Sequence, residues 1–238
     1  MIIIPARLAS SRFPNKILVD VLGLPMAIRT AKVAQNVDDV VIATDSNEVI
    51  EIAKKHKIKA VLTSLNHQSG TDRINEAAKK LNLKDEDIII NVQADEPFIE
   101  EDIIIKLKNQ VERLTKTESF VMVSCYKKVS SEEAQDPNLV KVVIDENSNA
   151  LYFSRSPIPF DRDKVGVSYF GHLGLYGFSV KSLNEFCNLK NAPLEHIEKL
   201  EQLRALSFGK KISMIEVTSR SFGIDTKEDL ARAIKLFG

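Results

Sequence analysis

The sequence has no tryptophan and only two cysteines among its 238 residues. Two isolated cysteines cannot build a disulfide framework, and neither belongs to a Cys-x-x-Cys or Cys/His cluster. Cys125 lies within an apolar run, which is typical of a small core residue rather than of a reactive thiol. Both thiols are therefore expected to be reduced, and the core has to stabilise the fold without crosslinks.

Long apolar runs and an excess of one charge are also missing. No run approaches the roughly 18 residues of a membrane span, and Met1–Pro5 has no basic segment that would make it a signal peptide. We therefore expect a cytoplasmic protein without a membrane partner. The 33 Lys and Arg balance the 33 Asp and Glu. This balance argues against a nucleic-acid partner, because non-specific binding to nucleic acid needs a summed positive field.

Short apolar runs alternate with segments of helical periodicity through the first half of the chain. Wholly apolar strands are covered on both faces, so this alternation predicts an α/β, Rossmann-like fold with a mostly parallel mixed sheet flanked by helices. Ligands of such folds bind beyond the carboxyl ends of the strands. The predicted strands are Ile2–Ile4, Val40–Ala43, Lys59–Leu62, Ile88–Val92 and Ser119–Cys125, and the helices are Pro25–Gln35, Asn47–His56, Asp72–Leu81 and Glu101–Thr115.

The second half departs from this rhythm and predicts an antiparallel excursion within one domain, 1–238. A hairpin is indicated by two short strands on either side of Glu146–Asn149. The predicted elements are strands at Val140–Asp145, Ala150–Ser154, Gly171–Phe178 and Ile212–Val217, and helices at Leu194–Phe208 and Lys227–Phe237.

The loop after the first predicted strand, Pro5–Lys16, contains no glycine. It is therefore neither a Gly-x-x-x-x-Gly-Lys-Ser/Thr loop nor a Gly-x-Gly-x-x-Gly turn. It supplies three cations, Arg7, Arg12 and Lys16, with almost no acidic residue nearby. Guanidinium forks and a lysine charge suit phosphate oxygens. We interpret the loop as a triphosphate cradle, and the alternative is a solvated basic loop.

Two acidic positions are candidates for a metal site. Asp95 follows the fourth predicted strand, on the edge of the sheet where the basic loop lies, and Mg²⁺ prefers one or two carboxylates together with phosphate oxygens. The alternative role of Asp95 is to begin the next helix. Asp225 precedes the last helix, where Thr226 and Asp229 have the spacing of a capping box. For Asp225 the sequence by itself favours the cap.

Further polar clusters are weaker signals. The run His67–Arg73 could hold a nucleotide with its hydroxyls and a helix N-terminus, or Ser69 could cap the helix. Thr44–Ser46 is interpreted as a helix cap. His172 and Tyr176 share one face of a strand by the two-residue period. The helix dipole is sufficient to explain Glu195. Arg155 directly follows the second strand of the predicted hairpin, which by itself is a weak signal.

Seven of these runs together resemble the 3-deoxy-manno-octulosonate (Kdo) cytidylyltransferases, also called CMP-Kdo synthetases. The resemblance implies transfer of CMP from CTP to the anomeric hydroxyl of Kdo, with release of pyrophosphate, for lipopolysaccharide biosynthesis. It also implies a magnesium-dependent, cytoplasmic homodimer. The runs occur in the family's order: Pro5–Lys16, His67–Arg73, Asn91–Pro97, Tyr152–Arg155, His172–Gly177, Pro193–Arg204 and Gly223–Leu230.

The resemblance assigns residue roles and divides the domain into a nucleotide-binding part, about 1–125, and a sugar-binding and dimerisation part, about 126–220. Arg7, Lys16, Asp95 and Asp225 would be catalytic, and Asp95 and Asp225 would hold magnesium, which replaces the cap interpretation of Asp225. The nucleotide would contact Pro5, Ala6, Arg7, Ser10, Arg12, Lys16, Thr71, Arg73 and Gln93. Kdo would contact Gln93, Arg155, His172, Tyr176 and Glu195.

The chain departs from the family pattern at two places. Ala94 stands where the family usually has glycine, and the segment between Asp163 and His172 looks shorter than usual. Two alternative functions stay open at this point. One is a cytidylyltransferase for another, sialate-like sugar acid, and the other is a CTP-binding regulator without catalysis.

Overall fold

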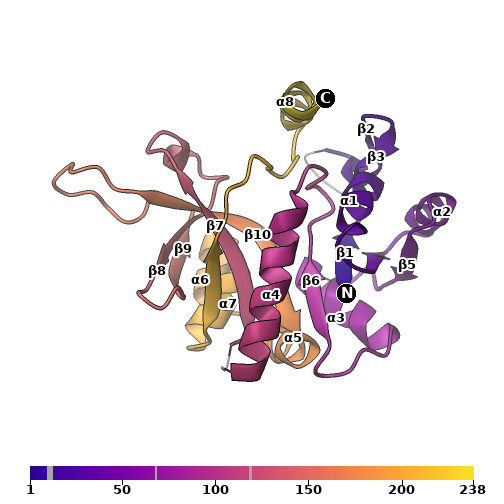
Figure 1. The fold of residues 1–238 in the computed structure, drawn as a ribbon, viewed down its shortest axis with the longest axis horizontal. Coiled ribbons are helices and arrows are strands. Elements are labelled where there is room, and N and C mark those ends of the chain that lie inside the picture. Colours follow the sequence, from indigo (N-terminus) through magenta and orange to yellow (C-terminus); the bar gives the residue numbers. More distant parts are fainter. Residues whose placement is uncertain (10–12, 68, 118–119) are drawn as a thin grey trace.

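The computed structural model describes residues 1–9, 13–67, 69–117 and 120–238. Within these ranges nine strands form one mixed sheet in the order β11-β7-β10-β6-β1-β4-β5, to which β8 and β9 are attached through β10 (Figure 1). The strands are β1 (Ile2–Ala6), β4 (Val40–Thr44), β5 (Lys59–Leu62), β6 (Ile88–Asn91), β7 (Met122–Val129), β8 (Lys141–Ile144), β9 (Ala150–Ser154), β10 (Tyr169–Ser179) and β11 (Ile212–Glu216).

Along the path from β11 to β5, most neighbouring strands run parallel. β4 and β6 both pair with β1 in parallel, β5 pairs with β4, and β11 pairs with β7 in the same sense. The long strand β10 is antiparallel to β6, β7 and β8, and β8 is antiparallel to β9. The predicted fold class, a mostly parallel mixed sheet with an antiparallel excursion in the second half, is confirmed.

Helices cover both faces of the sheet (Figure 1). Residues of α1, α2 and α4 join one apolar cluster, and residues of α3, α5 and α7 join the other. None of the helices in the described parts of the chain is both long and apolar enough to cross a membrane. The helices are α1 (Met26–Ala34), α2 (Asn47–Lys55), α3 (Gly70–Lys80), α4 (Glu101–Thr117), α5 (Val180–Cys187), α6 (Pro193–Glu198), α7 (Gln202–Ser207) and α8 (Lys227–Phe237).

The side chains of β1 show why its apolar run predicts a strand buried on both faces. Ile2 and Ile4 belong to the cluster under α1, α2 and α4, whereas Ile3 belongs to the opposite cluster. All three are inaccessible to solvent. Successive residues of a strand point to opposite faces, so a strand between two helix layers has to be apolar at every position.

The structure corrects two predictions of local structure. The predicted helix Leu194–Phe208 is two short helices, α6 and α7, because Lys199 adopts a left-handed conformation (φ 55°) that ends α6. The sequence pattern also did not predict a small two-stranded hairpin, β2 (Asp20–Val21) and β3 (Leu24–Pro25). Two-residue strands are too short to give a periodic signal.

Candidate functional site

A cavity of about 280 Å³, called here the smaller cavity, lies beyond the carboxyl ends of β1 and β6. It collects residues from five separate places in the sequence, because parallel strands bring their carboxyl ends to one edge of the sheet. Ala6 is buried at the end of β1. Ser10 and Arg12, which were predicted to bind the nucleotide, lie outside the described residues. The predicted residues that line the smaller cavity are Pro5, Arg7, Lys16, Arg73, Gln93, Asp95 and Asp225.

The ammonium group of Lys16 joins the two acidic candidates at the smaller cavity. Its Nζ atom lies 2.6 Å from Oδ2 of Asp95 and 2.7 Å from Oδ1 of Asp225. Burial by itself would lower the pKa of Lys16, but attraction to Asp95 and Asp225 outweighs burial and raises the pKa. The two carboxylates, which are far apart in the sequence, therefore converge on one cation.

This arrangement fits a magnesium ion in its donor chemistry. Asp95 and Asp225 already share a positive group, and one or two carboxylates completed by phosphate oxygens and water are the ligands that Mg²⁺ prefers. In the described part of the chain, no cluster of three or more His, Cys, Asp or Glu side chains is assembled. A divalent cation here would thus depend on ligands from a bound nucleotide.

The cap of α8 and the position of Asp225 are compatible with each other. Thr226 and Asp229 form the capping box of α8, with the Thr226 hydroxyl accepting from the Asp229 amide at 3.1 Å. Asp225, one residue earlier, turns toward Lys16. The backbone amide of Ile224 donates to the carbonyl of Asp95 at 2.9 Å, which ties the two acidic segments together.

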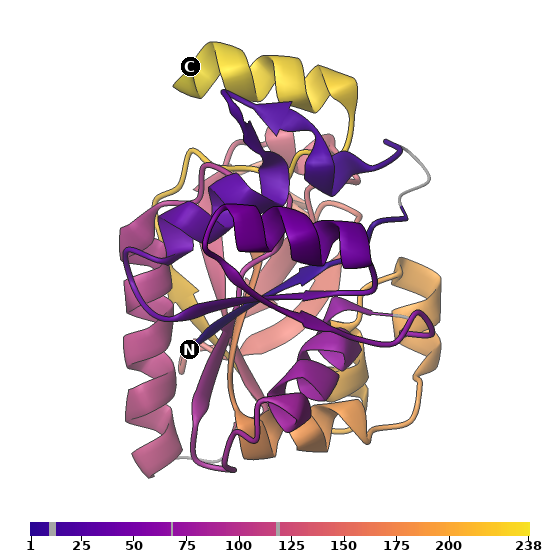
Figure 2. The ribbon, with the colours of Figure 1, turned by 90° about the vertical axis from the view of Figure 1, so that its right-hand side faces the viewer.

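A small apolar cluster holds α8 over the β2–β3 hairpin (Figure 2). Ile224 and Ala233 pack there with Val21 of β2, and the rings of Phe98 and Phe237 stack with centroids 4.5 Å apart. Phe98 follows Asp95 by three residues, and Phe237 closes the helix that begins next to Asp225. This cluster thereby fixes the relative position of the two carboxylate-bearing segments.

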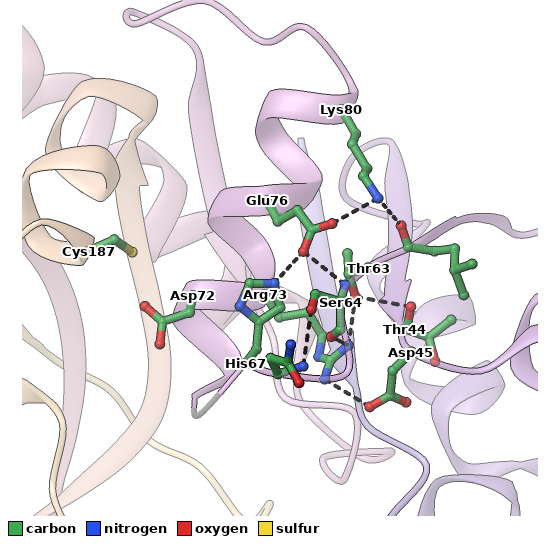
Figure 3. Close-up of polar contacts among 12 residues, drawn as sticks. Thr44, Asp45, Thr63, Ser64, His67, Asp72, Arg73, Glu76, Lys80 and Cys187 are labelled. Atoms are coloured by element: carbon green, nitrogen blue, oxygen red, sulfur yellow. Dashed lines mark hydrogen bonds and ion pairs between the residues drawn. The ribbon is translucent and has the colours of Figure 1, made fainter.

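Arg73 borders the smaller cavity, but its guanidinium is held by protein groups (Figure 3). It donates to Asp45 at 2.9 Å and to the hydroxyl of Thr63 at 2.6 Å, and the side chains of Arg73 and Asp45 are only 3% and 5% exposed. Asp45 also accepts from the backbone amide of Leu8 at 3.1 Å. Ser46 is the N-cap residue of α2, as the cap interpretation of Thr44–Ser46 predicts, but without a side-chain cap hydrogen bond. Asp45 instead links α3 to the start of the basic loop.

The segment before α3 is fixed by both cap and packing contacts. Ser69 caps α3 by accepting from the Asp72 amide at 3.1 Å, so the predicted cap exists at the wall of the cavity. A Cβ atom at Gly70 would lie 3.2 Å from Cγ of Pro5, closer than most such contacts. Glycine here lets the start of α3 approach β1. Thr71 is buried and donates to Glu201 at 2.6 Å, away from the lining of the smaller cavity.

A larger cavity of about 1090 Å³ adjoins the first, and Asp225 lines both. His172 and Tyr176 of β10 line this larger cavity. Burial lowers the pKa of His172 to about 3, so the imidazole is neutral at neutral pH, and it lies 2.8 Å from the Ser124 hydroxyl. The Tyr176 hydroxyl donates to Gln202 at 3.3 Å. Gln93 reaches the edge of this region by donating to the Gly174 carbonyl at 3.2 Å.

Two predicted sugar-contacting residues are not brought to either cavity. Glu195 is paired with the guanidinium of Arg204 at 2.5 and 2.9 Å. Arg155 donates to main-chain carbonyls, at 2.7 Å to Glu198 and at 2.9 Å to Pro137. Neither side chain lines the larger or the smaller cavity. Strand and helix patterns give no information on these partners.

Several acidic and amide side chains that line the larger cavity were not predicted as site residues, among them Glu96, Glu201 and Gln202. Burial, followed by repulsion from Asp95, raises the pKa of Glu96 to about 7, although the Ser221 hydroxyl donates to it at 2.8 Å. Glu201 and Gln202 fell inside the predicted helix Leu194–Phe208. The break between α6 and α7 directs them into the cavity, and only a signal for that break could have identified them.

Comparisons with known proteins agree on one family. Residues 1–212 match the model of the family described as cytidylyltransferase. The 3-deoxy-manno-octulosonate cytidylyltransferase of Wolinella succinogenes is 59% identical over 100% of this chain and 99% of its own length. The enzyme of that name from Helicobacter pylori (strain 26695) is 53% identical over 100% of this chain and 97% of its own.

The structural comparison gives the same result. A solved structure of CMP:2-keto-3-deoxy-manno-octonic acid synthetase complexed with CTP has a TM-score of 0.90 and 35% sequence identity, and the match covers 99% of this chain and 96% of that one. A glucose-1-phosphate thymidylyltransferase from Bacillus anthracis, at 17% identity and a TM-score of 0.66, shares the fold.

Proposed function

The chain belongs to the 3-deoxy-manno-octulosonate cytidylyltransferase family, and we propose that it transfers CMP from CTP to the anomeric hydroxyl of Kdo. The reaction forms CMP-Kdo for lipopolysaccharide assembly and releases pyrophosphate. One observation carries the proposal. The acidic pair Asp95 and Asp225, bridged by Lys16, lies where a small polar cavity meets a larger one. This is the geometry that a nucleotide and a second substrate need in order to react.

The smaller cavity provides the groups for the nucleotide. Arg7 and Lys16 supply cations for the phosphates, and the reaction replaces the α-phosphorus bond to pyrophosphate with a bond to the sugar oxygen. In such transfers the protein mainly positions the reactants and neutralises charge. Ser10 and Arg12 are proposed to complete the phosphate contacts. Arg73, fixed by Asp45, orients the start of α3 beside the nucleotide.

Part of the wall of the larger cavity offers uncharged hydrogen-bonding groups, which we propose receive the sugar acid. His172 and Tyr176 stay uncharged at neutral pH, because burial lowers the pKa of the imidazole and raises that of the phenol. Gln202 and Glu201 extend the same wall, and hydroxyl-rich ligands suit such donors and acceptors. We propose that these groups, with Gln93, contact Kdo. Arg155 and Glu195 would support the cavity wall through their protein contacts, without touching the sugar.

Asp95 and Asp225 are proposed to hold magnesium. When bound there, the ion would neutralise phosphate charge and lower the pKa of a coordinated hydroxyl. Lys16 is the residue that offsets the charge of both carboxylates in the described structure, and it is placed to accompany phosphate oxygens as they enter.

Pyrophosphate release from CTP and magnesium tests the proposal, with Kdo, with N-acetylneuraminate and with no sugar. Of these three conditions, only the one with Kdo is expected to release pyrophosphate. Release with N-acetylneuraminate alone would replace the sugar assignment and keep the nucleotide side. A folded protein that binds CTP but releases no pyrophosphate with either acid would contradict catalysis and favour a regulatory role.

We further propose that the chain is a cytoplasmic homodimer whose interface involves the segment 155–168 between β9 and β10, which projects from the body of the molecule (Figure 1). Phe160 and Val165 in this segment are 86% and 82% exposed, and such apolar side chains indicate an interaction surface. Light scattering should give twice 26.6 kDa. Phe160→Asp should shift the mass to the monomer, whereas Leu65→Asp, at a site 76% exposed, should not. A monomeric wild-type protein would contradict the proposal.

A further inference from the structure

Lys141, at the start of β8, is a buried cation without an acidic partner in hydrogen-bond contact. Its side chain is inaccessible to solvent, and no other charged side chain in the described residues is buried as completely. All three protons of its ammonium have acceptors, and every acceptor is a main-chain carbonyl: Asp136 at 2.8 Å, Leu139 at 2.6 Å and Arg155 at 2.6 Å. A buried charge is retained at a cost, so this one calls for an explanation.

Two of these carbonyls belong to the segment 136–140, which forms part of the wall of the larger cavity. Asp136, Asn138, Leu139 and Val140 all line that cavity. The segment has no strand or helix of its own, and the 3-10 turn Glu133–Gln135 ends just before it. Two of its main-chain carbonyls, those of Asp136 and Leu139, therefore depend on the ammonium of Lys141 for their hydrogen bonds.

The wall is connected to His172 by direct contacts. The carbonyl of Val140 accepts from the backbone amide of His172 at 2.8 Å. A Cβ atom at Gly171 would lie 3.1 Å from a side-chain methyl of Leu139, so the absence of a side chain leaves room for Leu139 beside β10. A shift of 136–140 would therefore be transmitted to the strand that carries His172.

The third carbonyl links the same wall to the segment after α6. The Arg155 guanidinium donates to Pro137 at 2.9 Å and to Glu198 at 2.7 Å, both main-chain carbonyls. Lys141 and Arg155 thus hold the segment 136–140 between them. The residues after Glu198 continue to Glu201 and Gln202, which line the larger cavity.

We propose that Lys141 is a positioning residue for the sugar acid, which sets the shape of the larger cavity by holding the carbonyls of Asp136, Leu139 and Arg155 around its ammonium. This inference rests on the proposed function of the cavity. Lys141 does not reach either cavity and acts through the wall alone. Its effect should therefore be confined to the sugar, because none of the wall residues lines the smaller cavity.

The test compares Lys141→Met with wild type by pyrophosphate release. Methionine keeps most of the side-chain length but removes the charge and all three donors. We expect the KM for Kdo to rise on the order of tenfold or more, since small displacements of positioning groups have effects of this size. The KM for CTP should stay within about twofold, because a mutation alters the KM only of the ligand whose binding it changes. Hydrogen exchange of the 136–140 amides should be faster in the variant.

Two further variants keep the test decisive. Lys141→Gln offers two donors, so it should show a smaller rise in the KM for Kdo, and it replaces the methionine variant if that protein does not fold. Lys128→Met is the matched control, since its side chain is 69% exposed. Equal changes in both KM values, an unchanged KM for Kdo, or unchanged exchange of 136–140 would overturn the inference. A wild-type protein silent with Kdo would instead remove the proposed function, and the inference with it.

Discussion

The buried cations near the two cavities have different kinds of partner. At the smaller cavity, charged side chains are paired with charged side chains: Lys16 with Asp95 and Asp225, and Arg73 with Asp45. Beside the larger cavity, Lys141 and Arg155 are held by main-chain carbonyls, and His172 is kept neutral by burial. The first arrangement accords with the proposed triphosphate ligand, and the second lies beside the cavity proposed for the sugar acid.

This difference has a consequence for how each region tolerates change. Removing one member of a buried ion pair leaves an uncompensated charge, which is costly. Removing a donor from a set of carbonyls leaves polar groups that can partly recover water at a cavity wall. Substitutions at the smaller cavity should therefore have the larger effects, and the following predictions are ordered accordingly.

Asp95→Asn should have the largest effect. The substitution removes one of two carboxylates around Lys16 and should lower kcat/KM by about 10³-fold or more, as expected for loss of a group that stabilises transferring phosphate. Pyrophosphate release measures the loss, and circular dichroism checks that the fold is intact. Asp102→Asn, on the exposed surface of α4, is the matched control. Turnover like that of wild type would remove Asp95 from the catalytic site.

Asp45→Asn should disturb the nucleotide side without touching the sugar side. Arg73 would lose its buried ion-pair partner, and the anchor of Leu8 would weaken. We expect the free energy of unfolding to fall by about 3 kcal/mol, measured by urea denaturation, and the KM for CTP to rise about tenfold, as loss of a positioning contact allows.

The control for this prediction is Asp39→Asn, a change of the same chemistry at an exposed position. A rise in the KM for Kdo of the same size as that for CTP would show that the two cavities are not independent. The two cavities would then differ in the chemistry of their surroundings but would not act independently of each other.

The buried imidazole of His172, which lines the larger cavity, should make the free energy of unfolding depend on pH. In an unfolded chain the pKa of histidine is about 6.5, and in the folded protein burial lowers it to about 3. Between these values only the unfolded state binds the extra proton. Stability should be unaffected by His172 above pH 6.5 and should fall below it, by up to about 1.4 kcal/mol per pH unit.

The measurement is urea denaturation of wild type and His172→Gln from pH 7.5 to pH 4.5. The difference between the two proteins isolates the histidine, because all other titrating groups are shared. His196→Gln, at an exposed site on α6, should reproduce the wild-type slope. Equal slopes for wild type and His172→Gln would contradict burial of the neutral imidazole.

Phe237→Ala should have the smallest effect, and it tests whether α8 fixes Asp225. Loss of the stack with Phe98 should lower the free energy of unfolding by about 1 kcal/mol, together with a modest fall in kcat. Phe208→Ala, a ring 45% exposed and outside both cavities, should leave kcat unchanged. An unchanged kcat in Phe237→Ala would show that Asp225 is positioned without the last turn of α8.

Much of the nucleotide side could be predicted from the sequence because its signals are local. The apolar run of β1 predicts a buried strand, and the carboxyl end of such a strand is where ligands bind, so the basic loop and Asp95 were found at once. Resemblance to a known family added Asp225, which spacing alone assigned to a helix cap. The structure places it beside Lys16 and leaves the cap to Thr226 and Asp229.

The surroundings of the larger cavity were predicted less well because their contacts connect distant segments through the backbone. The break at Lys199 splits one predicted helix and brings Glu201 and Gln202 into the larger cavity. Arg155 and Glu195 satisfy their charges elsewhere, with main-chain carbonyls and with Arg204. The periodicity of apolar residues in a sequence does not indicate to which main-chain carbonyl a side chain will donate.

The sequence by itself determined the α/β architecture, the family, and the basic and acidic residues at the ends of β1 and β6, because periodicity and motif order are local properties of the chain. Only the tertiary structure decided which charges meet. Lys16 lies between two carboxylates from distant parts of the chain, Asp45 pairs with Arg73, and Lys141 donates to three main-chain carbonyls. Such pairings depend on the packing of whole elements against one another, and that packing places residues distant in sequence within hydrogen-bond reach.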